Sequence, residues 1–261
     1  MTFNTNITLH DLPTNLPHKQ PISPFTSLVR YVLNYKQLSY TTEWRLWSDL
    51  QATAKSLGVE PTGVLADGSP RYTVPFIIDR TGDGYAVIVS DSVKIIEYLE
   101  KTYPDPERPI IGPSPAVQHL ARMPIDRFFN SFVVQLVLPA VYDLVLEEDK
   151  IAFFNRVSSY FKDLPQDRPE KGFQGVAIME GSVEFIKLIE EGEENLRGIA
   201  ASLGSQQLFG GDRPVFVDFV LLAYLNCIRR TRPDVWKYFA KVDEGRFQKA
   251  VDSGEEFGKL L

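Results

Sequence analysis

Apolar side chains along the first forty-five residues switch between the spacing of a strand and that of a helix. Residues 7–12 and 38–44 alternate apolar and polar side chains, as half-buried strands do. Between them, residues 25–32 repeat apolar side chains at i, i+3, i+4 and i+7, the spacing of a helix with one buried face. The chain is therefore predicted to open with a strand–helix–strand unit.

The helix of this unit has a clear start signal. Ser23 precedes the apolar run, and Pro24 is its first residue. Serine is a favoured N-cap, and proline suits the first helical position because it has no N–H to leave unpaired. The helix therefore begins with a hydroxyl and free backbone N–H groups at its positive end, which is suited to hold an anion.

The next sixty residues complete a small domain. A short helix is predicted over 47–57, and strands over 73–79 and 85–89 are joined by Thr81-Gly82-Asp83-Gly84, a strong hairpin signal. Ser90-Asp91-Ser92 then starts another helix. A βαβ unit followed by a hairpin and a helix predicts a small mixed sheet with helices packed on it.

Helical patterns dominate the rest of the chain. Residues 104–115 contain five prolines and are predicted to form a linker. After it we expect helical segments over 116–146 that bend near Pro124 and Pro139, helices over 147–161 and 176–203, an exposed connection over 162–175, and a buried central helix over 215–230.

Composition narrows the class of protein. A net charge of −6 leaves no basic stripe for nucleic acid. The single cysteine, Cys227, excludes an internal disulfide and fits a reducing compartment. The N-terminus lacks the regions of a signal peptide, and no uninterrupted apolar run reaches membrane length. We expect a cytoplasmic protein with neither nucleic-acid nor membrane partners.

Four local motifs match a known family. They are Ser-Pro-Phe at 23–25, Val74-Pro75 at a strand start, Asp91-Ser92 at a helix start, and Phe209 to Pro214 followed by Asp218. With these four motifs in this order along the sequence, the chain resembles a glutathione transferase. The resemblance implies a thioredoxin-like, glutathione-binding domain over residues 1–105, a linker over 106–115, and an all-helical domain over 116–261 that completes the hydrophobic substrate site.

Longer stretches resemble one class within that superfamily. Tyr31 to Lys36, Thr42 to Trp44, and Ser90 to Leu99 resemble the fungal-specific class A transferases of wood-decaying fungi, which are related to bacterial etherases. The resemblance implies glutathione as co-substrate, a homodimer, and a part in the detoxification of wood-derived molecules.

Two positions depart from the pattern of that class. It commonly has Trp-Ser-Pro-Asn where this chain has Ile22-Ser23-Pro24-Phe25, a change beside the sulfur site. Val215 replaces the Ser or Thr cap of the central helix, so Asp218 is expected to lose its capping-box partner. The second change concerns folding rather than chemistry.

Two roles are open for Ser23, as an N-cap alone or also as the group that binds the glutathione thiol. The thiolate is the nucleophile, and a free thiol with a pKa of about 8.5 is only a few per cent ionised at neutral pH. A hydroxyl donor and helix N–H groups would lower that pKa by ~2 units. Because serine forms no mixed disulfide, this predicts conjugation, thiolysis or peroxide reduction rather than disulfide exchange.

The other motifs have structural alternatives too. Val74-Pro75 is either an ordinary strand start or, as the resemblance implies, the place where the backbone of Val74 pairs with the cysteinyl part of glutathione. Ser90-Asp91-Ser92 is well suited to cap a helix. The resemblance adds that Ser92 would hold the γ-glutamyl carboxylate and that Asp91 would accept from its ammonium group.

The remaining candidates are weaker. Cys227 fits a small core residue better than a nucleophile, and the three histidines lack metal-ligand spacing, so no metal cofactor is expected. Four aromatic residues are either core or part of the wall of an apolar pocket: Phe128, Phe129, Phe132 and Tyr142.

Three functions remain open on the sequence. The first is a transferase in which Ser23 activates glutathione for attack on small hydrophobic, aromatic compounds or peroxides. The second is a non-catalytic carrier, or ligandin, of polyphenolic compounds in the same cleft. The third is a scaffold protein that keeps the fold without activity, which the intact Ser23, Val74-Pro75 and Asp91-Ser92 set argues against.

Overall fold

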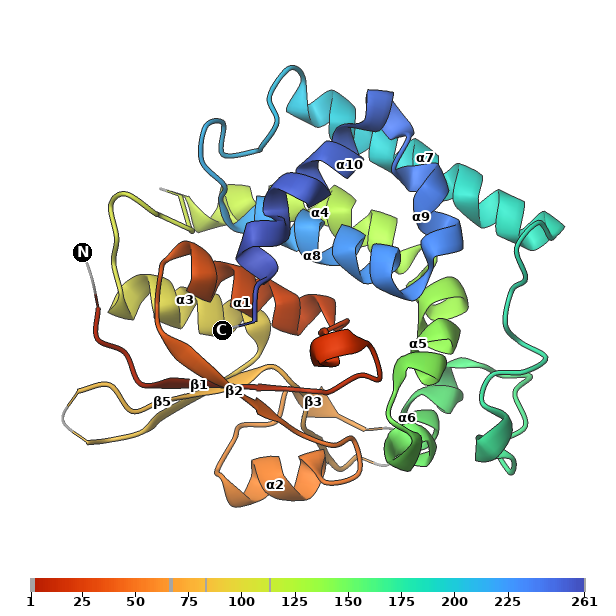
Figure 1. Cartoon of the computed structure of the whole chain (residues 1–261), viewed down its shortest axis with the longest axis horizontal. Coiled ribbons are helices and arrows are strands. Elements are labelled where there is room, and N and C mark those ends of the chain that lie inside the picture. Colours follow the sequence, from red (N-terminus) through yellow and green to blue (C-terminus); the bar gives the residue numbers. More distant parts are fainter. Residues whose placement is uncertain (1–2, 66–67, 83, 113, 261) are drawn as a thin grey trace.

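The computed structural model describes residues 3–65, 68–82, 84–112 and 114–260. Figure 1 shows a sheet with α1 and α3 on one face and α2 on the other, next to a larger unit built from helices. The first unit comprises the strands β1 (Ile7–Asp11), β2 (Tyr40–Trp44), β3 (Gly63–Val64), β4 (Pro70–Arg71), β5 (Phe76–Asp79) and β6 (Val87–Ser90), and the helices α1 (Pro24–Tyr35), α2 (Leu50–Ser56) and α3 (Ser92–Thr102).

The sheet has the mixed topology that the sequence predicts. Its strand order is β2-β1-β5-β6, with β2 parallel to β1 and the other neighbours antiparallel. Leu9 lies opposite Thr42 on one side and Ile77 on the other, and both Leu9 and Ile77 are fully buried. The predicted strand–helix–strand opening is confirmed, and the architecture is the thioredoxin-like one that the resemblance implies.

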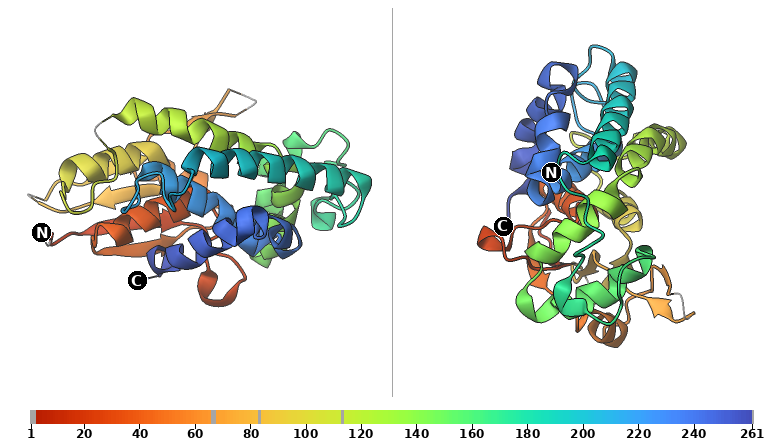
Figure 2. Two further views of the ribbon diagram at one scale, coloured as in Figure 1. Left: turned by 90° about the horizontal axis from the view of Figure 1, so that it is seen from above. Right: turned by 90° about the vertical axis from the view of Figure 1, so that its right-hand side faces the viewer.

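The second unit is entirely helical, as expected. It contains α4 (Pro115–Asn130), α5 (Leu138–Leu144), α6 (Lys150–Val157), α7 (Val183–Leu203), α8 (Phe216–Thr231), α9 (Pro233–Phe239) and α10 (Val242–Ser253). Residues 216–228 of α8 are all buried, so α8 is the central helix that its apolar pattern predicts. Figure 2 shows α7 running along α4, and the two helices pack together.

Contacts between the units centre on α1. This helix packs against α8, where Asn226 donates through Nδ2 to the Tyr31 hydroxyl at 2.8 Å. The C-terminal residues also lie beside α1 (Figure 1), since Asn34 Nδ2 donates to the carbonyls of Phe257 and Lys259 at 2.6 and 3.0 Å. Residues 26–33 of α1 are all buried, whereas Phe25, the first apolar residue of the predicted face, remains exposed.

Several predicted boundaries in the helical unit are wrong. The change of direction expected near Pro139 corresponds to the break between α4 and α5, where Val133–Val137 forms a π-helical turn, whereas α4 continues through Pro124. Pro139 lies in the first turn of α5, where its missing N–H has no intrahelical partner to lose. The helix expected over 147–161 is shorter, because 3₁₀ turns flank α6 on both sides.

The helix predicted over 176–203 starts seven residues late. Gly181 has a left-handed backbone with φ +82°, and the Ser182 hydroxyl then accepts from the Phe185 N–H at 3.1 Å. The chain before it is not simply the exposed connection expected, because Phe173 is 4% exposed and packs against Tyr142 and Phe154.

The predicted strands of the first unit are also shorter than expected. The ladder of β5 starts at Phe76, so Thr73, Val74 and Pro75 precede it. Strands β3 and β4 were not predicted; they have two residues each and form an antiparallel pair in the Gly- and Pro-containing stretch after α2. Asp83 of the predicted turn and Pro113 of the predicted linker lie outside the described residues.

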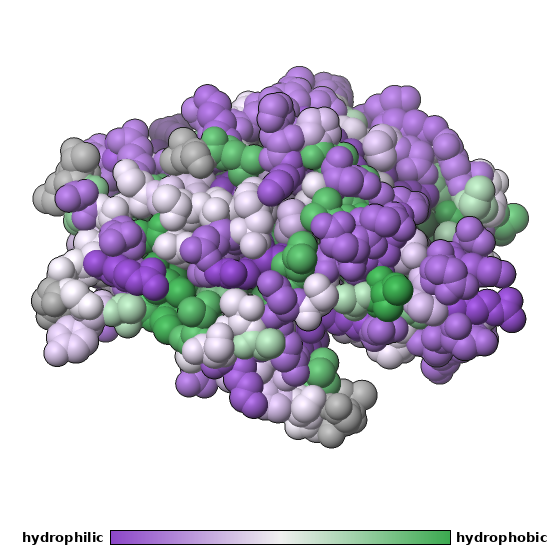
Figure 3. Space-filling view, turned by 60° about the horizontal axis from the view of Figure 1, so that its bottom comes forward, coloured by the Kyte–Doolittle hydropathy of each residue, from purple (hydrophilic) through white to green (hydrophobic). Residues whose placement is uncertain are grey.

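Among the described residues, no helix combines the length and apolar composition needed to cross a bilayer. On the face in Figure 3, hydrophilic residues predominate, and hydrophobic ones form small separate groups.

Candidate active site

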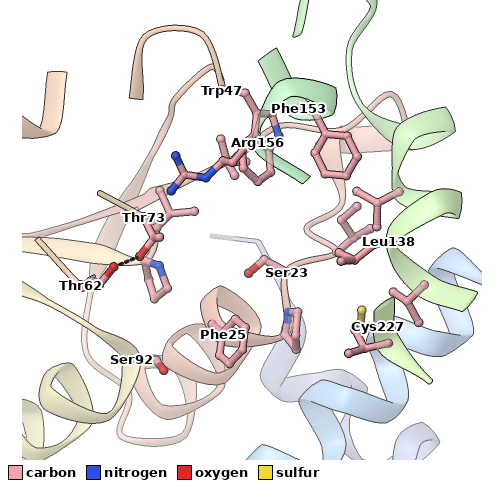
Figure 4. Close-up of a pocket in the computed structure, with 18 of the residues that line it drawn as sticks. Ser23, Phe25, Trp47, Thr62, Thr73, Ser92, Leu138, Phe153, Arg156 and Cys227 are labelled. Atoms are coloured by element: carbon pink, nitrogen blue, oxygen red, sulfur yellow. Dashed lines mark hydrogen bonds between the residues drawn. The ribbon is translucent and has the colours of Figure 1, made fainter. Parts of the chain in front are cut away.

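A cavity of about 430 Å³ is lined by both units and brings the four predicted site residues together. Ser23, Val74, Asp91 and Ser92 line it from the first unit, while helices α4, α5, α6 and α8 contribute walls from the second. The side toward Ser92 carries hydroxyl and carboxylate groups, and the side toward α5 is apolar (Figure 4). Such a cavity suits a ligand that is polar at one end and apolar at the other.

Ser23 is the N-cap of α1, as the sequence predicts. Its Oγ accepts from the Thr26 N–H at 3.3 Å, and Pro24 is the first helical residue. In Figure 4 the hydroxyl points into the cavity, between the polar and the apolar sides. Since the cap uses Oγ as an acceptor, the hydroxyl proton remains available for a second partner.

Val74 lies at the cavity wall, directly before β5. The Val74–Pro75 peptide bond is cis. The register between β1 and β5 begins only at Phe76, so Val74 has no partner in that ladder. Its main-chain groups can therefore pair with an extended ligand.

Asp91 and Ser92 form the start of α3. Asp91 Oδ1 accepts from the N–H groups of Val93 and Lys94 at 2.9 and 3.2 Å, so the capping role considered for this motif is present. Among the residues that the structure describes, only Oδ1 of this carboxylate caps the helix. The second oxygen and the Ser92 side chain can serve a ligand at the positive end of the helix.

The proline-containing loop before Ser23 lies beside the cavity and is tied to the second unit. Asn15 donates through its main-chain N–H to Leu144 at 2.9 Å and through Nδ2 to the carbonyl of Asp143 at 2.7 Å. Arg230 donates to the carbonyl of Pro21 at 2.6 Å. The loop contributes Pro13, Thr14 and Ile22 to the cavity lining.

Aromatic and branched residues form the apolar side. Trp47 and Phe153 meet edge to face with ring centroids 5.2 Å apart, and Leu138 faces them (Figure 4). Of the four aromatic residues considered from the sequence, Phe129 lines the cavity, whereas Phe128, Phe132 and Tyr142 are buried away from it.

Cys227 is a buried core residue, as the sequence predicts, and its place in the cavity lining was not expected. It is a buried residue of α8, and it also lines the cavity wall (Figure 4). Burial raises the pKa of its thiol to about 12. The thiol is therefore neutral at physiological pH and is an apolar wall element rather than a nucleophile.

One carboxylate of the second unit shapes the cavity indirectly. Asp149 is 1% exposed and accepts from the N–H groups of Trp47 and Ser48 at 2.8 and 3.1 Å and from the Ser48 hydroxyl at 3.0 Å. It thus fixes the loop that carries Trp47. Sequence patterns could not reveal this contact, because Asp149 and Trp47 lie 102 residues apart.

Further polar residues of the cavity lining were also missed from the sequence. The hydroxyls of Thr62 and Thr73 are 2.9 Å apart, and Arg71 and Arg156 lie in the lining together with Arg122, which is paired with Asp126. Arg71 belongs to the unpredicted strand β4, and Arg156 to α6. Among the described residues, no group of three histidine, cysteine or acidic side chains is arranged to hold a metal ion.

Comparisons with known proteins agree with this architecture. The family model described as glutathione S-transferase, N-terminal domain, matches residues 18–107, and that described as glutathione S-transferase, C-terminal domain, matches residues 125–257. A curated relative, the glutathione S-transferase-like protein ustS of Aspergillus flavus, is 27% identical over 227 residues, which are 84% of this chain and 79% of the relative.

Solved structures of fungal proteins are similar over nearly their whole length. The glutathione S-transferase CsGST63524 of Ceriporiopsis subvermispora, solved in complex with glutathione, is 26% identical with a TM-score of 0.83. GSTFuA3 of Phanerochaete chrysosporium is 26% identical with a TM-score of 0.81. In both comparisons, 98% of each chain is covered.

Proposed function

This chain belongs to the glutathione transferase family, and we propose that it activates the glutathione thiol through Ser23 for reaction with small hydrophobic, aromatic compounds. The observation that carries the proposal is the position of the Ser23 hydroxyl. It points into the cavity at the start of α1, between the polar side and the apolar side (Figure 4).

On the polar side of the cavity, the arrangement of polar groups favours one orientation of glutathione. Its γ-glutamyl end would lie at the start of α3, where Ser92 and the helix N–H groups meet the carboxylate and the free Asp91 oxygen accepts from the ammonium group. The cysteinyl main chain would pair with Val74 like an added strand. Its sulfur would then lie next to the Ser23 hydroxyl.

The proposed activation predicts a low pKa for the bound thiol. Donation from the Ser23 hydroxyl to sulfur, reinforced by the α1 N–H groups, would lower the pKa from about 8.5 to about 6.5. The thiolate absorbs in the far ultraviolet, so a pH titration of the difference spectrum of the complex measures this pKa. A value that stays at about 8.5 in the saturated complex would contradict the proposed role of Ser23.

The apolar side supports an aromatic second substrate. Trp47, Phe153 and Leu138 surround a space on the far side of Ser23 from Ser92 (Figure 4), and Phe25 remains 43% exposed. Flat rings gain both buried area and edge-to-face contacts in such surroundings. Conjugation, thiolysis or peroxide reduction, as part of the detoxification of wood-derived molecules, is the activity that we propose for this site.

The same apolar walls also favour one alternative, a carrier of polyphenolic compounds. Burial of aromatic rings against Trp47 and Phe153 could bind such compounds without any reaction at sulfur. Binding at low micromolar affinity with negligible turnover across a panel of electrophiles would favour the carrier. Turnover that depends on Ser23 would favour the enzyme.

We further propose that the chain forms a homodimer through α4. Val117, Leu120 and Met123 follow one another at intervals of three residues on this helix and are 59%, 66% and 59% exposed. Sedimentation velocity should give twice the 29.6 kDa mass of the chain, and Leu120→Glu should shift it to the monomer. A wild-type protein that sediments as a monomer at micromolar concentration would exclude this interface.

A further inference from the structure

Three side chains of α6 and of the turn before it contact one short segment of the first unit. Asp149, Phe153 and Arg156 follow one another at i, i+4 and i+7, the spacing of a single helix face. Phe153 meets the Trp47 ring edge to face at 5.2 Å, and the Arg156 guanidinium lies 5.9 Å from the centroid of the same ring. Asp149 binds the main chain at Trp47 and Ser48. The face thus contacts both the ring and the backbone of the segment that carries Trp47.

The Asp149 carboxylate depends on this segment for its hydrogen bonds. It is 1% exposed, and its Oδ2 accepts from the Trp47 N–H at 2.8 Å. Its Oδ1 accepts from the N–H and the hydroxyl of Ser48 at 3.1 and 3.0 Å. A buried carboxylate without donors is costly, so any other position of the segment would be penalised. Asp149 therefore selects one position of the backbone at Trp47.

The segment has little local structure of its own to hold Trp47. Residues 45–49 lie between β2 and α2 and belong to neither. Asp49, which precedes α2, makes no side-chain hydrogen bond that would cap this helix. The Trp47 ring is only partly buried, and it lines the apolar side of the cavity next to Phe153 (Figure 4). The orientation of this wall therefore depends on contacts with α6.

We propose that Asp149 is a positioning residue for the second substrate, because it holds Trp47 in the orientation at which an aromatic ring packs against Trp47 and Phe153. The inference rests on the proposed function and deepens it, since it assigns the preference for aromatic over aliphatic compounds to a contact between the two units. Asp149 is not part of the cavity lining, so it acts through Trp47 and touches no substrate.

Two enones that share a reactive group test this role. The thiolate adds to the same carbon of the C=C bond in benzylideneacetone and in ethylideneacetone, and that carbon carries a phenyl group in the first and a methyl group in the second. Asp149→Ala should lower kcat/KM for the phenyl enone about fivefold to tenfold, mainly through KM. The methyl enone and the KM for glutathione should be unaffected. Asp149→Asn retains one acceptor oxygen and should give a smaller loss.

Asp218→Ala is the matched control. It removes a carboxylate of similar burial that also accepts from three donors, but outside the cavity lining. It should leave the ratio of kcat/KM between the two enones unchanged. Comparison of the enones cancels general damage to the fold, because both substrates experience it. If Asp149→Ala does not fold, the same comparison with Asp149→Asn decides.

A double-mutant cycle tests whether Asp149 acts through Trp47. Trp47→Ala should cause at least the same loss for the phenyl enone, and Asp149→Ala should add nothing in that background. Additive effects of the two substitutions, or an equal effect of Asp149→Ala on both enones, would overturn the positioning role.

Binding of benzylacetone separates this role from thiol activation. This ketone carries the same ring but lacks the C=C bond, so it does not react, and calorimetric titration should show about fivefold to tenfold weaker binding to Asp149→Ala. If the wild type turns over neither enone but this loss occurs, thiol activation fails and the positioning role stands. If turnover depends on Ser23 but Asp149→Ala leaves both the enone ratio and benzylacetone binding unchanged, the positioning role fails and activation stands.

Discussion

Replacement of Ser23 by alanine should lower kcat/KM for thiol-dependent conjugation about 25-fold at pH 7. The expected size follows from the thiolate fraction, which falls from about 75% at a thiol pKa of ~6.5 to about 3% at ~8.5. The cap to the Thr26 N–H is lost as well, at about 1 kcal/mol of folding free energy. Steady-state assays with several aromatic electrophiles at saturating glutathione measure the loss.

The pH dependence distinguishes thiol activation from simple damage to the site. The rate of the wild type should rise as the pH passes about 6.5, since the reactive thiolate forms above the pKa of the bound thiol. In Ser23→Ala that rise should move up by ~2 pH units, and the two rates should converge above about pH 9. Unchanged kcat/KM across the panel would remove Ser23 from the mechanism.

Two further variants act as controls for the lost cap. Ser182→Ala deletes the same kind of N-cap from α7, where the hydroxyl accepts from the Phe185 N–H at 3.1 Å. It should cost similar stability and leave the kinetics unchanged, because Ser182 is not part of the cavity lining. Ser23→Thr keeps both the cap and the hydroxyl donor and should retain most of the activity.

Local signals explain why parts of the site could be predicted from the sequence. The starts of α1 and α3 depend on residues next to each other in the chain, so Ser23-Pro24 and Asp91-Ser92 were located correctly as helix starts. Helix α8 is apolar nearly all round, and this pattern identifies a buried helix without knowledge of its neighbours.

Contacts between distant elements explain what could not be predicted. Arg71 enters the cavity from a hairpin with only two residues in each strand, too short for a period-two pattern to be detected. Arg156 and Asp149 act on residues of the first unit that lie more than eighty positions away. The late start of α7 depends on the left-handed backbone of Gly181, which periodicity cannot register.

Replacement of Asp218 by alanine should lower the free energy of unfolding by about 3–5 kcal/mol. Its carboxylate is 2% exposed and accepts from three main-chain N–H groups, those of Phe209, Gly210 and Val215, at 2.7, 3.1 and 2.9 Å. Alanine would leave these donors without their acceptor where water reaches them poorly. Thermal denaturation should show a fall in Tm of about 10 °C.

Val215, which replaces the usual Ser or Thr cap of α8, affects how much stability Asp218 contributes. Valine has no side-chain acceptor, but the Val215 N–H still donates to Asp218, so one half of the capping box is present. Asp218 therefore loses only part of the capping-box interaction that the sequence analysis expected it to lose. Val215→Thr should restore the other half and add about 0.5–1 kcal/mol, since the backbone at 215 is extended, with φ −121° and ψ 177°. Asp218→Asn keeps one acceptor oxygen and should lie between the wild type and alanine.

Asp218 is not part of the cavity lining, so its loss should separate stability from chemistry. At a temperature well below the lowered Tm, Asp218→Ala should retain the kcat/KM of the wild type while unfolding at lower denaturant concentration. If its unfolding free energy changed by less than about 1 kcal/mol, water would be replacing the carboxylate at all three N–H groups. The loop from Phe209 to Pro214 would then depend on its own turns, and not on Asp218, for its attachment to α8.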